Sequence, residues 1–214
     1  MRREPLLRQY FETMLAALGE SGWWPAETPF EVAVGAILTQ NTAWTNVERA
    51  IAALKAADVL SPAAMLALPE AHLAELIRPA GYFRVKAKRL RHFLTFLQHH
   101  GGDILALRQV PHIRERLLEV SGIGPETADS ILLYALEIPS FVVDAYTRRI
   151  FHRHGLVPED ISYEDLRAYF ADALTADVQL YKEFHALIVR TAKEWCRAKP
   201  RCALCPLAPL LPSS

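Results

Sequence analysis

Apolar side chains recur every three to four residues through much of the chain, which is the period of an amphipathic α-helix. The pattern is clearest over 30–38, 85–99 and 181–195, and in the last two stretches charged residues alternate with the apolar ones. Two β-branched stretches, 138–143 and 188–189, are too isolated to build a sheet. We therefore predict an all-α fold of about ten helices joined by short loops.

Polar residues mark the starts of several of these helices. Serine, threonine and aspartate accept hydrogen bonds from the first free backbone amides of a helix, and proline is tolerated at its first position. Thr28-Pro29-Phe30-Glu31 resembles a capping box with proline after the cap. Similar starts are expected at Ser61-Pro62 and at Ser162 with Asp165.

Composition places the chain among globular proteins and says little more. It has 214 residues, of which 51% are hydrophobic and 22% charged. No apolar run approaches the roughly 18–20 residues that span a bilayer, so we expect no membrane association. The segment from Met1 to Gln9 is charged and lacks the apolar core of a signal peptide. We expect a cytoplasmic protein, in the bacterial cytoplasm or nucleoid.

The net charge is zero, with 24 basic and 24 acidic residues, which argues mildly against a nucleic-acid-binding protein. The distribution is uneven, however, because basic residues gather in two runs. Each run fits either a nucleic-acid contact or an ordinary solvated helix face. The runs are Arg84, Lys86, Lys88, Arg89 and Arg91, and Arg190, Lys193, Arg197, Lys199 and Arg201.

The most specific local motif is Gly122-Ile123-Gly124-Pro125, between an apolar helix end and the start of another helix. Two glycines permit a tight turn with exposed amides, and amides near a helix start favour an anion. The apolar Ile123 can plug between the two helices. This arrangement fits a clamp on one DNA phosphate, independent of base sequence. The alternative is a plain helix–helix connection with a glycine turn.

A carboxylate follows the apolar run Phe141-Val142-Val143 twenty residues beyond the hairpin. Asp144 leads into the next helix, so helix capping is its simplest interpretation. Capping and a catalytic role are compatible.

Together these motifs resemble the endonuclease III branch of the helix-hairpin-helix DNA glycosylases. The resemblance covers nearly the whole chain, and five segments carry it in order. They are Gly35-Ala-Ile-Leu-Thr-Gln-Asn-Thr42, Gly81-Tyr-Phe-Arg-Val-Lys-Ala87, the hairpin, Val143-Asp144 and the cysteines at 196–205. It implies a central six-helix lobe over 28–137 and a second lobe from 1–27 with 138–214, with double-stranded DNA in the cleft between them. We expect a monomer.

The resemblance also implies roles for individual residues. Asp144 falls at the catalytic aspartate, and Gln40 at the residue that fills the space left by an extruded nucleotide. Tyr82 falls where the family places a wedge in the opposite strand, and Gly122, Ile123 and Gly124 form the phosphate-binding hairpin. Arg84 and Lys86 are further candidates for DNA contact.

One departure from the family bears on the chemistry. Bifunctional members carry a lysine two residues after the second hairpin glycine, and it forms a Schiff base with the sugar. This chain has Glu126 there, and a carboxylate cannot form an imine. We expect hydrolysis by water instead, with Asp144 stabilising the cation that develops on the sugar and orienting the water.

Aromatic residues near the expected cleft suggest a base pocket. Trp23, Trp24 and Pro25 precede the first helix of the central lobe, Trp44 follows Gln40, and Lys193 lies in the last long helix. Together with Val142-Val143-Asp144 and the segment from His185 to Lys193, these residues resemble the 3-methyladenine DNA glycosylase III subgroup. An alkylated purine is positively charged, so stacking on tryptophan gains a cation–π contribution. The tryptophans equally fit a protein core, and Lys193 a helix surface.

The three cysteines lie close together, unlike a disulfide framework. Five residues separate Cys196 from Cys202 and two separate Cys202 from Cys205. The tail resembles the structural [4Fe–4S] loop of endonuclease III, but the fourth cysteine would fall at Leu211. Two alternatives stay open: a cluster with a non-cysteine fourth ligand, or a decayed site. Zinc fits less well, because no histidine or fourth cysteine follows Cys205. No cofactor is needed for the chemistry.

We therefore expect a monofunctional base-excision-repair glycosylase for alkylated purines. Two alternatives remain: an endonuclease III-type enzyme for oxidised pyrimidines or mismatched bases, and a non-catalytic DNA-binding relative. The sequence does not specify the range of lesions, the opposite base or residual lyase activity.

Overall fold

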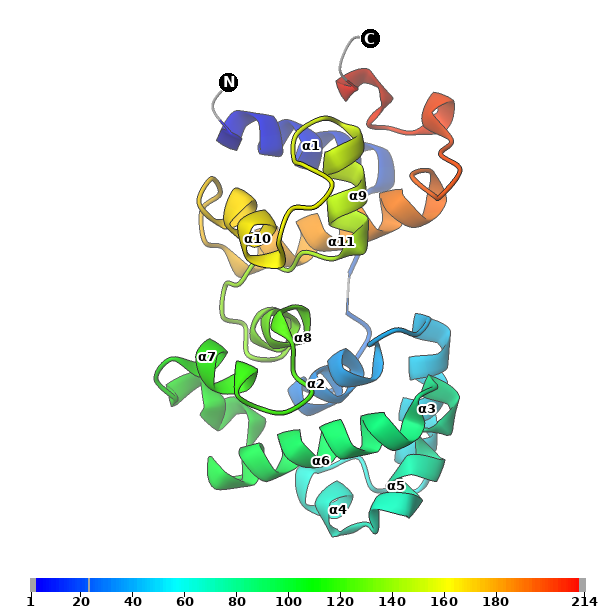
Figure 1. Cartoon of the computed structure of the whole chain (residues 1–214), viewed down its shortest axis with the longest axis vertical. Helices are drawn as coiled ribbons and strands as arrows, with labels where there is room; N and C mark the ends of the chain where they lie inside the picture. Colours follow the sequence, from blue (N-terminus) through cyan, green and yellow to red (C-terminus); the bar gives the residue numbers. More distant parts are fainter. Residues whose placement is uncertain (1–2, 23, 212–214) are drawn as a thin grey trace. The chain divides into compact units, whose positions relative to one another are not determined.

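The computed structural model describes residues 3–22 and 24–211, which contain helices and turns and no β-strand. They confirm the predicted all-α class. The chain divides into two compact units, one of residues Met1–Pro25 with Pro139–Ser214 and one of Ala26–Ile138. Figure 1 shows the helices of each unit.

The Ala26–Ile138 unit is a bundle around the buried helix α2 (Pro29–Leu38). Helix α6 (Phe83–His99) packs along α4 (Pro62–Ala67) and α5 (Glu70–Leu76), and it also contacts α2 (Figure 1). The remaining elements are α3 (Trp44–Ala56), the short helices η1 (Arg78–Ala80) and η2 (Ile104–Gln109), α7 (Ile113–Leu118), α8 (Pro125–Ser130) and the π-helical turn η3 (Ile131–Ala135).

The other unit is built on three helices that meet in an aromatic core. α11 (Val178–Glu194) packs against α1 (Arg3–Leu18) and α9 (Ala145–Arg153). Phe141 stacks on Phe170 of α10 (Tyr163–Ala171) with ring centroids 4.3 Å apart, and Phe184 of α11 meets both rings edge-on. The short helices η4 (Cys202–Leu204) and η5 (Ala208–Leu210) follow α11.

The predicted helix starts are confirmed, with one difference. The Thr28 hydroxyl accepts a hydrogen bond from the Glu31 amide, as in a capping box. The Glu31 carboxylate, however, accepts from the amide of Glu27 rather than from that of Thr28. Ser61 caps α4 in the same way as Thr28. α11 begins earlier than its apolar pattern indicated, because Asp177 accepts a 2.7 Å hydrogen bond from the Leu180 amide.

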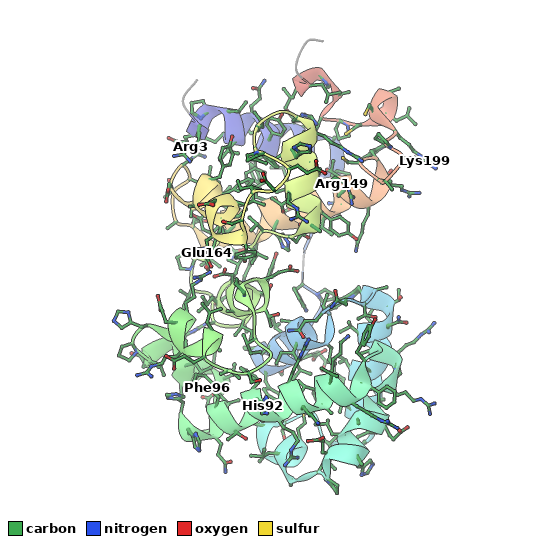
Figure 2. All side chains as sticks on the ribbon, viewed as in Figure 1. Arg3, His92, Phe96, Arg149, Glu164 and Lys199 are labelled. Atoms are coloured by element: carbon green, nitrogen blue, oxygen red, sulfur yellow. The ribbon has the colours of Figure 1, made fainter. Side chains whose placement is uncertain are left out.

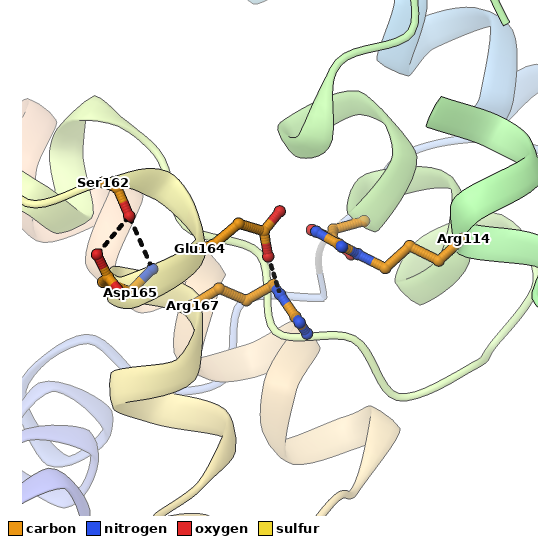
Figure 3. A network of polar contacts seen from close by, with 6 residues as sticks. Arg114, Ser162, Glu164, Asp165 and Arg167 are labelled. Atoms are coloured by element: carbon orange, nitrogen blue, oxygen red, sulfur yellow. Dashed lines mark hydrogen bonds and ion pairs between the residues drawn. The ribbon is translucent and has the colours of Figure 1, made fainter. Parts of the chain in front are cut away.

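The start of α10 shows the same local chemistry in a close view (Figure 3). The Ser162 hydroxyl accepts from the Asp165 amide at 3.1 Å and donates to the Asp165 carboxylate at 2.6 Å. Arg167 forms an ion pair with Glu164 one turn along the helix, at 3.2 Å. These contacts among residues 162–167 define the beginning of α10.

Two basic side chains of the predicted runs serve as helix caps. Arg91 of α6 donates to the carbonyl of Leu66, in the last turn of α4, and to that of Leu68, the residue that follows the helix. Arg190 of α11 donates to the carbonyls of Leu18 and Gly19 at the end of α1. Cations at helix C-termini satisfy free carbonyls and oppose the helix dipole.

Within residues 3–22 and 24–211, no helix combines the length and the apolar character that crossing a lipid bilayer requires.

Candidate functional site

Asp144 is the N-cap of α9, and its mostly buried carboxylate remains partly accessible. Its Oδ1 accepts hydrogen bonds from the Thr147 amide at 2.7 Å and from the Thr147 hydroxyl at 2.9 Å. The Thr147 hydroxyl in turn lies 3.3 Å from the Asp144 amide, which completes a capping box. The predicted cap is therefore confirmed, and it holds one carboxylate oxygen in place while the side chain stays 13% exposed.

His185 is a neighbour of Asp144 that sequence reasoning did not assign to the site. Its Nε2 lies 3.7 Å from Asp144 Oδ2, and its ring is buried on α11. Burial by itself would raise the pKa of Asp144, but His185 and the two Thr147 contacts outweigh it and hold that pKa below its usual value. Asp144 is therefore ionised at neutral pH.

The hairpin between α7 and α8 has one glycine that geometry requires. Gly122 has φ +94°, and a Cβ built on it would lie 2.2 Å from Arg89 Cγ. Gly124 is extended, with φ −91°, and caps α8. Its missing side chain leaves open space, so it keeps the turn accessible without strain. Ile123 is 5% exposed and is buried as a plug, so its side chain does not face solvent.

A partly buried ion pair joins the two helices of the hairpin. Arg114 of α7 donates from Nε and Nη2 to the two oxygens of Asp129 on α8, at 2.8 and 2.9 Å. Asp129 is fully buried. A bidentate pair fixes relative orientation as well as distance, so the turn at Gly122 lies between two helices held in register.

Gln40 is bound into the hairpin by its side chain. Its Nε2 donates to the Gly122 carbonyl at 3.0 Å and to the Thr127 hydroxyl at 2.9 Å. Arg89 of α6 donates to its Oε1. His92, one turn further along α6, lies 3.0 Å through Nδ1 from the Ser121 carbonyl (Figure 2). Gln40, the hairpin and α6 therefore form one polar network.

The segment before α6 carries an exposed aromatic ring on a constrained backbone. Tyr82 is 72% exposed with φ 45°, in the left-handed region that non-glycine residues seldom adopt, and Gly81 before it has φ +67°. Arg84 and Val85, in the first turn of α6, are also exposed.

Lys86 corrects the sequence-based expectation of a DNA contact. Its side chain is 1% exposed, and its Nζ donates to the carbonyls of Leu38 and Ala80 at 2.8 and 2.7 Å. Burial and the charge of Arg89 lower the pKa of Lys86 to about 8. The basic run on α6 thus contains two kinds of residue, because Arg84 and Lys88 are exposed whereas Lys86 is buried and bound to backbone carbonyls.

The expected base-pocket residues divide between the two units. Trp24 is half-buried and Pro25 exposed, whereas Trp23 lies outside the described residues. The segment before them is tied to α11, because the Ser21 amide donates to Glu183 at 2.8 Å. Trp44 begins α3 and donates to Glu48 at 2.8 Å. Lys193 is exposed near the end of α11, and Glu126 is exposed in the first turn of α8.

The three cysteines line one pocket. The other lining side chains are mostly apolar, and Leu211 is among them, at the place where the family would have its fourth cysteine. Arg153 of α9 lies 3.3 Å through Nη1 from Cys196 Sγ, and Arg149 donates to the Cys196 carbonyl at 2.7 Å (Figure 2). Burial and the neighbouring thiols raise the pKa of Cys205. No three histidine, cysteine or carboxylate side chains within the described part converge as ligands of a single ion.

Comparison with known proteins gives a consistent set of relatives. A protein of Methanocaldococcus jannaschii, MJ1434, named as a candidate DNA repair glycosylase, is 46% identical over 206 residues, 94% of each chain. Endonuclease III of Bacillus subtilis is 27% identical, covering 85% of this chain and 80% of its own. The structure of Helicobacter pylori 3-methyladenine DNA glycosylase MagIII, bound to 1,N6-ethenoadenine, superposes with a TM-score of 0.75 at 29% identity, covering 91% of this chain and 98% of that one.

The family model of base excision DNA repair proteins matches residues 34–175. This segment contains Gln40, Tyr82, the hairpin and Asp144. The chain therefore belongs to the HhH-GPD superfamily of base excision DNA repair proteins.

Proposed function

We propose that this protein is a DNA glycosylase that hydrolyses the N-glycosidic bond of a damaged base extruded from double-stranded DNA. The observation that carries the proposal is the carboxylate of Asp144, ionised and held by Thr147 and His185. A base inside a duplex cannot be reached for this chemistry, so the nucleotide has to leave the stack first. Gln40, Tyr82 and the hairpin are the candidates for holding the distorted duplex.

Asp144 has two tasks in the proposed reaction. As the glycosidic bond breaks, positive charge develops on the sugar, and a fixed carboxylate stabilises that charge without having to reorganise. The same carboxylate orients a water molecule and accepts its proton. Oδ1 is occupied by Thr147, so we assign the water to Oδ2, on the side of His185. His185 would then act by positioning Asp144.

The proposed reaction is monofunctional. A combined glycosylase and lyase needs an amine that attacks the sugar. At the position where the family's bifunctional members place that lysine, this chain has Glu126. Its carboxylate cannot form a Schiff base, so water is the nucleophile in the proposal and no covalent DNA intermediate forms.

We further propose alkylated purines such as 3-methyladenine as substrates. The support is the similarity to the 3-methyladenine glycosylase MagIII, together with the tryptophans that the sequence suggests for the base pocket. Alkylation puts positive charge on the base, which strengthens stacking on tryptophan by about 0.5–2 kcal/mol. The same charge makes the base a good leaving group, which suits a site with one ionised carboxylate.

A panel of defined lesion duplexes tests this proposal. We expect release of 3-methyladenine and of other N-alkylated purines under single-turnover conditions, with no release of thymine glycol. Release of thymine glycol without release of alkylated purines would instead assign the protein to the oxidised-pyrimidine class. Asp144→Asn supplies the matched control, because asparagine is as good a helix cap as aspartate. It should keep the fold and the DNA affinity while losing base release, and a fully active variant would overturn the proposal.

We also propose that the pocket lined by the three cysteines holds a structural iron–sulfur cluster. Cys196, Cys202 and Cys205 line one pocket, and cysteine thiolates are the ligands of [4Fe–4S] clusters. The chain has the apolar Leu211 in place of the fourth cysteine. A cluster there would be held by Cys196, Cys202 and Cys205 and would stiffen the basic loop around Lys199 and Arg201. Iron and sulfide content of protein purified without oxygen, with the visible absorption of the chromophore, tests this, and Cys202→Ser is the control.

A further inference from the structure

Helix α6 presents two inward-facing cations about one turn apart, Lys86 and Arg89. The Lys86 ammonium is almost completely buried and donates to two backbone carbonyls, those of Leu38 and Ala80. A buried ammonium is costly unless it is hydrogen-bonded. The Lys86 side chain is therefore held in the interior by these two specific hydrogen bonds.

The two carbonyls belong to the two segments that approach DNA in the proposed function. Leu38 is the last residue of α2, two positions before Gln40. Ala80 is the last residue of η1, two positions before Tyr82. A cation at these carbonyls also opposes the dipole at the C-terminus of α2. One ammonium thus ties the Gln40 segment to the Tyr82 segment.

Helix α6 also contacts Tyr82, Gln40 and the hairpin directly. Tyr82 is the N-cap of α6, and its carbonyl accepts from the Lys86 amide at 2.9 Å. Arg89 binds the side chain of Gln40 and fills the space beside Gly122. Three residues of α6 and its cap therefore serve the three segments in succession. Tyr82 carries the exposed ring, Lys86 binds the end of α2, and Arg89 binds Gln40 beside the hairpin.

We propose that Lys86 is a positioning residue that holds Gln40 and Tyr82 in a fixed relation, so that both enter the duplex as one preformed unit. This inference rests on the proposed roles of Gln40 and Tyr82 in the distorted duplex. Ordering two separate loops during binding would cost conformational entropy, whereas a preformed pair avoids that cost at the moment of extrusion. The effect should therefore appear in binding to distorted DNA and not in binding to regular duplex.

The test compares Lys86→Met with Lys88→Met, which removes an exposed cation from the same helix. Affinity is measured for an undamaged duplex and for the same duplex with a tetrahydrofuran abasic analogue, which needs no base release. Lys86→Met should keep the affinity for undamaged duplex within about twofold and lose at least about tenfold on the analogue. Lys88→Met should lower both affinities by a similar factor, as expected for a phosphate contact. An unchanged ratio of the two affinities in Lys86→Met would overturn the inference.

A second measurement leaves Lys86 in place and covers the case in which Lys86→Met fails to fold. Gln40→Ala and Tyr82→Ala are combined in a double-mutant cycle on analogue binding. If Lys86 couples the two segments, the double variant should be less impaired than the product of the single effects. Strictly multiplicative effects would overturn the inference. A wild-type protein that does not prefer the analogue would contradict the proposed function instead, which keeps the two failures distinct.

Discussion

Replacing Gly122 by alanine is the sharpest test of how the hairpin is built. The position combines a φ of +94° with an Arg89 side chain whose Cγ, Cδ and Cβ would lie 2.2, 2.9 and 3.0 Å from the new methyl group. The clash involves the root of the arginine side chain and not its flexible end, so Arg89 has to move as a whole. Its hydrogen bond to Gln40 would then be lost.

Gly101 is a closely matched control in the same unit. Its φ is +93°, and a Cβ there would meet nothing within 4 Å. Alanine at Gly101 therefore incurs only the left-handed backbone cost, roughly 1–2 kcal/mol. Alanine at Gly122 adds the loss of a hydrogen bond to a charged group, about 1.5–3 kcal/mol. We expect total destabilisation of about 2.5–5 kcal/mol at Gly122.

Chemical denaturation with a probe in the Ala26–Ile138 unit measures the difference between the two variants. A third variant, Gly122→Ala combined with Arg89→Ala, removes the obstacle. In the Arg89→Ala background, the loss of stability caused by Gly122→Ala should approach the loss caused by Gly101→Ala, because only the backbone strain remains. Equal destabilisation in the two single variants, or no relief in the Arg89→Ala background, would refute the packing argument.

Three further predictions follow from the ion pairs and the carboxylates. Asp129→Asn breaks the bidentate ion pair between the fully buried Asp129 and the partly exposed Arg114 and should destabilise the protein by about 1.5–3 kcal/mol in urea denaturation, whereas a loss under 1 kcal/mol would mean that the pair is dispensable. The folded-state pKa of Asp144 is lowered, so its contribution to stability is present above about pH 4 and is lost as the pH falls through the lower value. The stability gap between wild type and Asp144→Asn should narrow on acidification below that pH, and a gap that widens would contradict the assigned pKa direction. Borohydride added during base release should trap no protein–DNA adduct, because Glu126 cannot form an imine; an adduct on a denaturing gel would show that another amine attacks the sugar.

The features that could be read from the sequence are those whose physics is local. Thr28, Ser61, Ser162 and Asp144 cap helices because a short polar side chain reaches an amide three residues away, whatever the rest of the chain does. Helical periodicity is equally local, and it predicted the all-α class. The glycine-rich hairpin was visible for the same reason, since its turn depends on backbone freedom at successive positions.

Tertiary structure alone decided which polar residues face inward. In the sequence, Lys86 and Lys88 are two similar cations on one amphipathic helix, yet Lys86 is buried because a free carbonyl 48 residues away lies within its reach. His185 comes to within 3.7 Å of Asp144 because α11 packs against α9, and no local pattern records that contact. A cation or an imidazole takes its role from the groups that the fold brings beside it, and those groups come from distant parts of the chain.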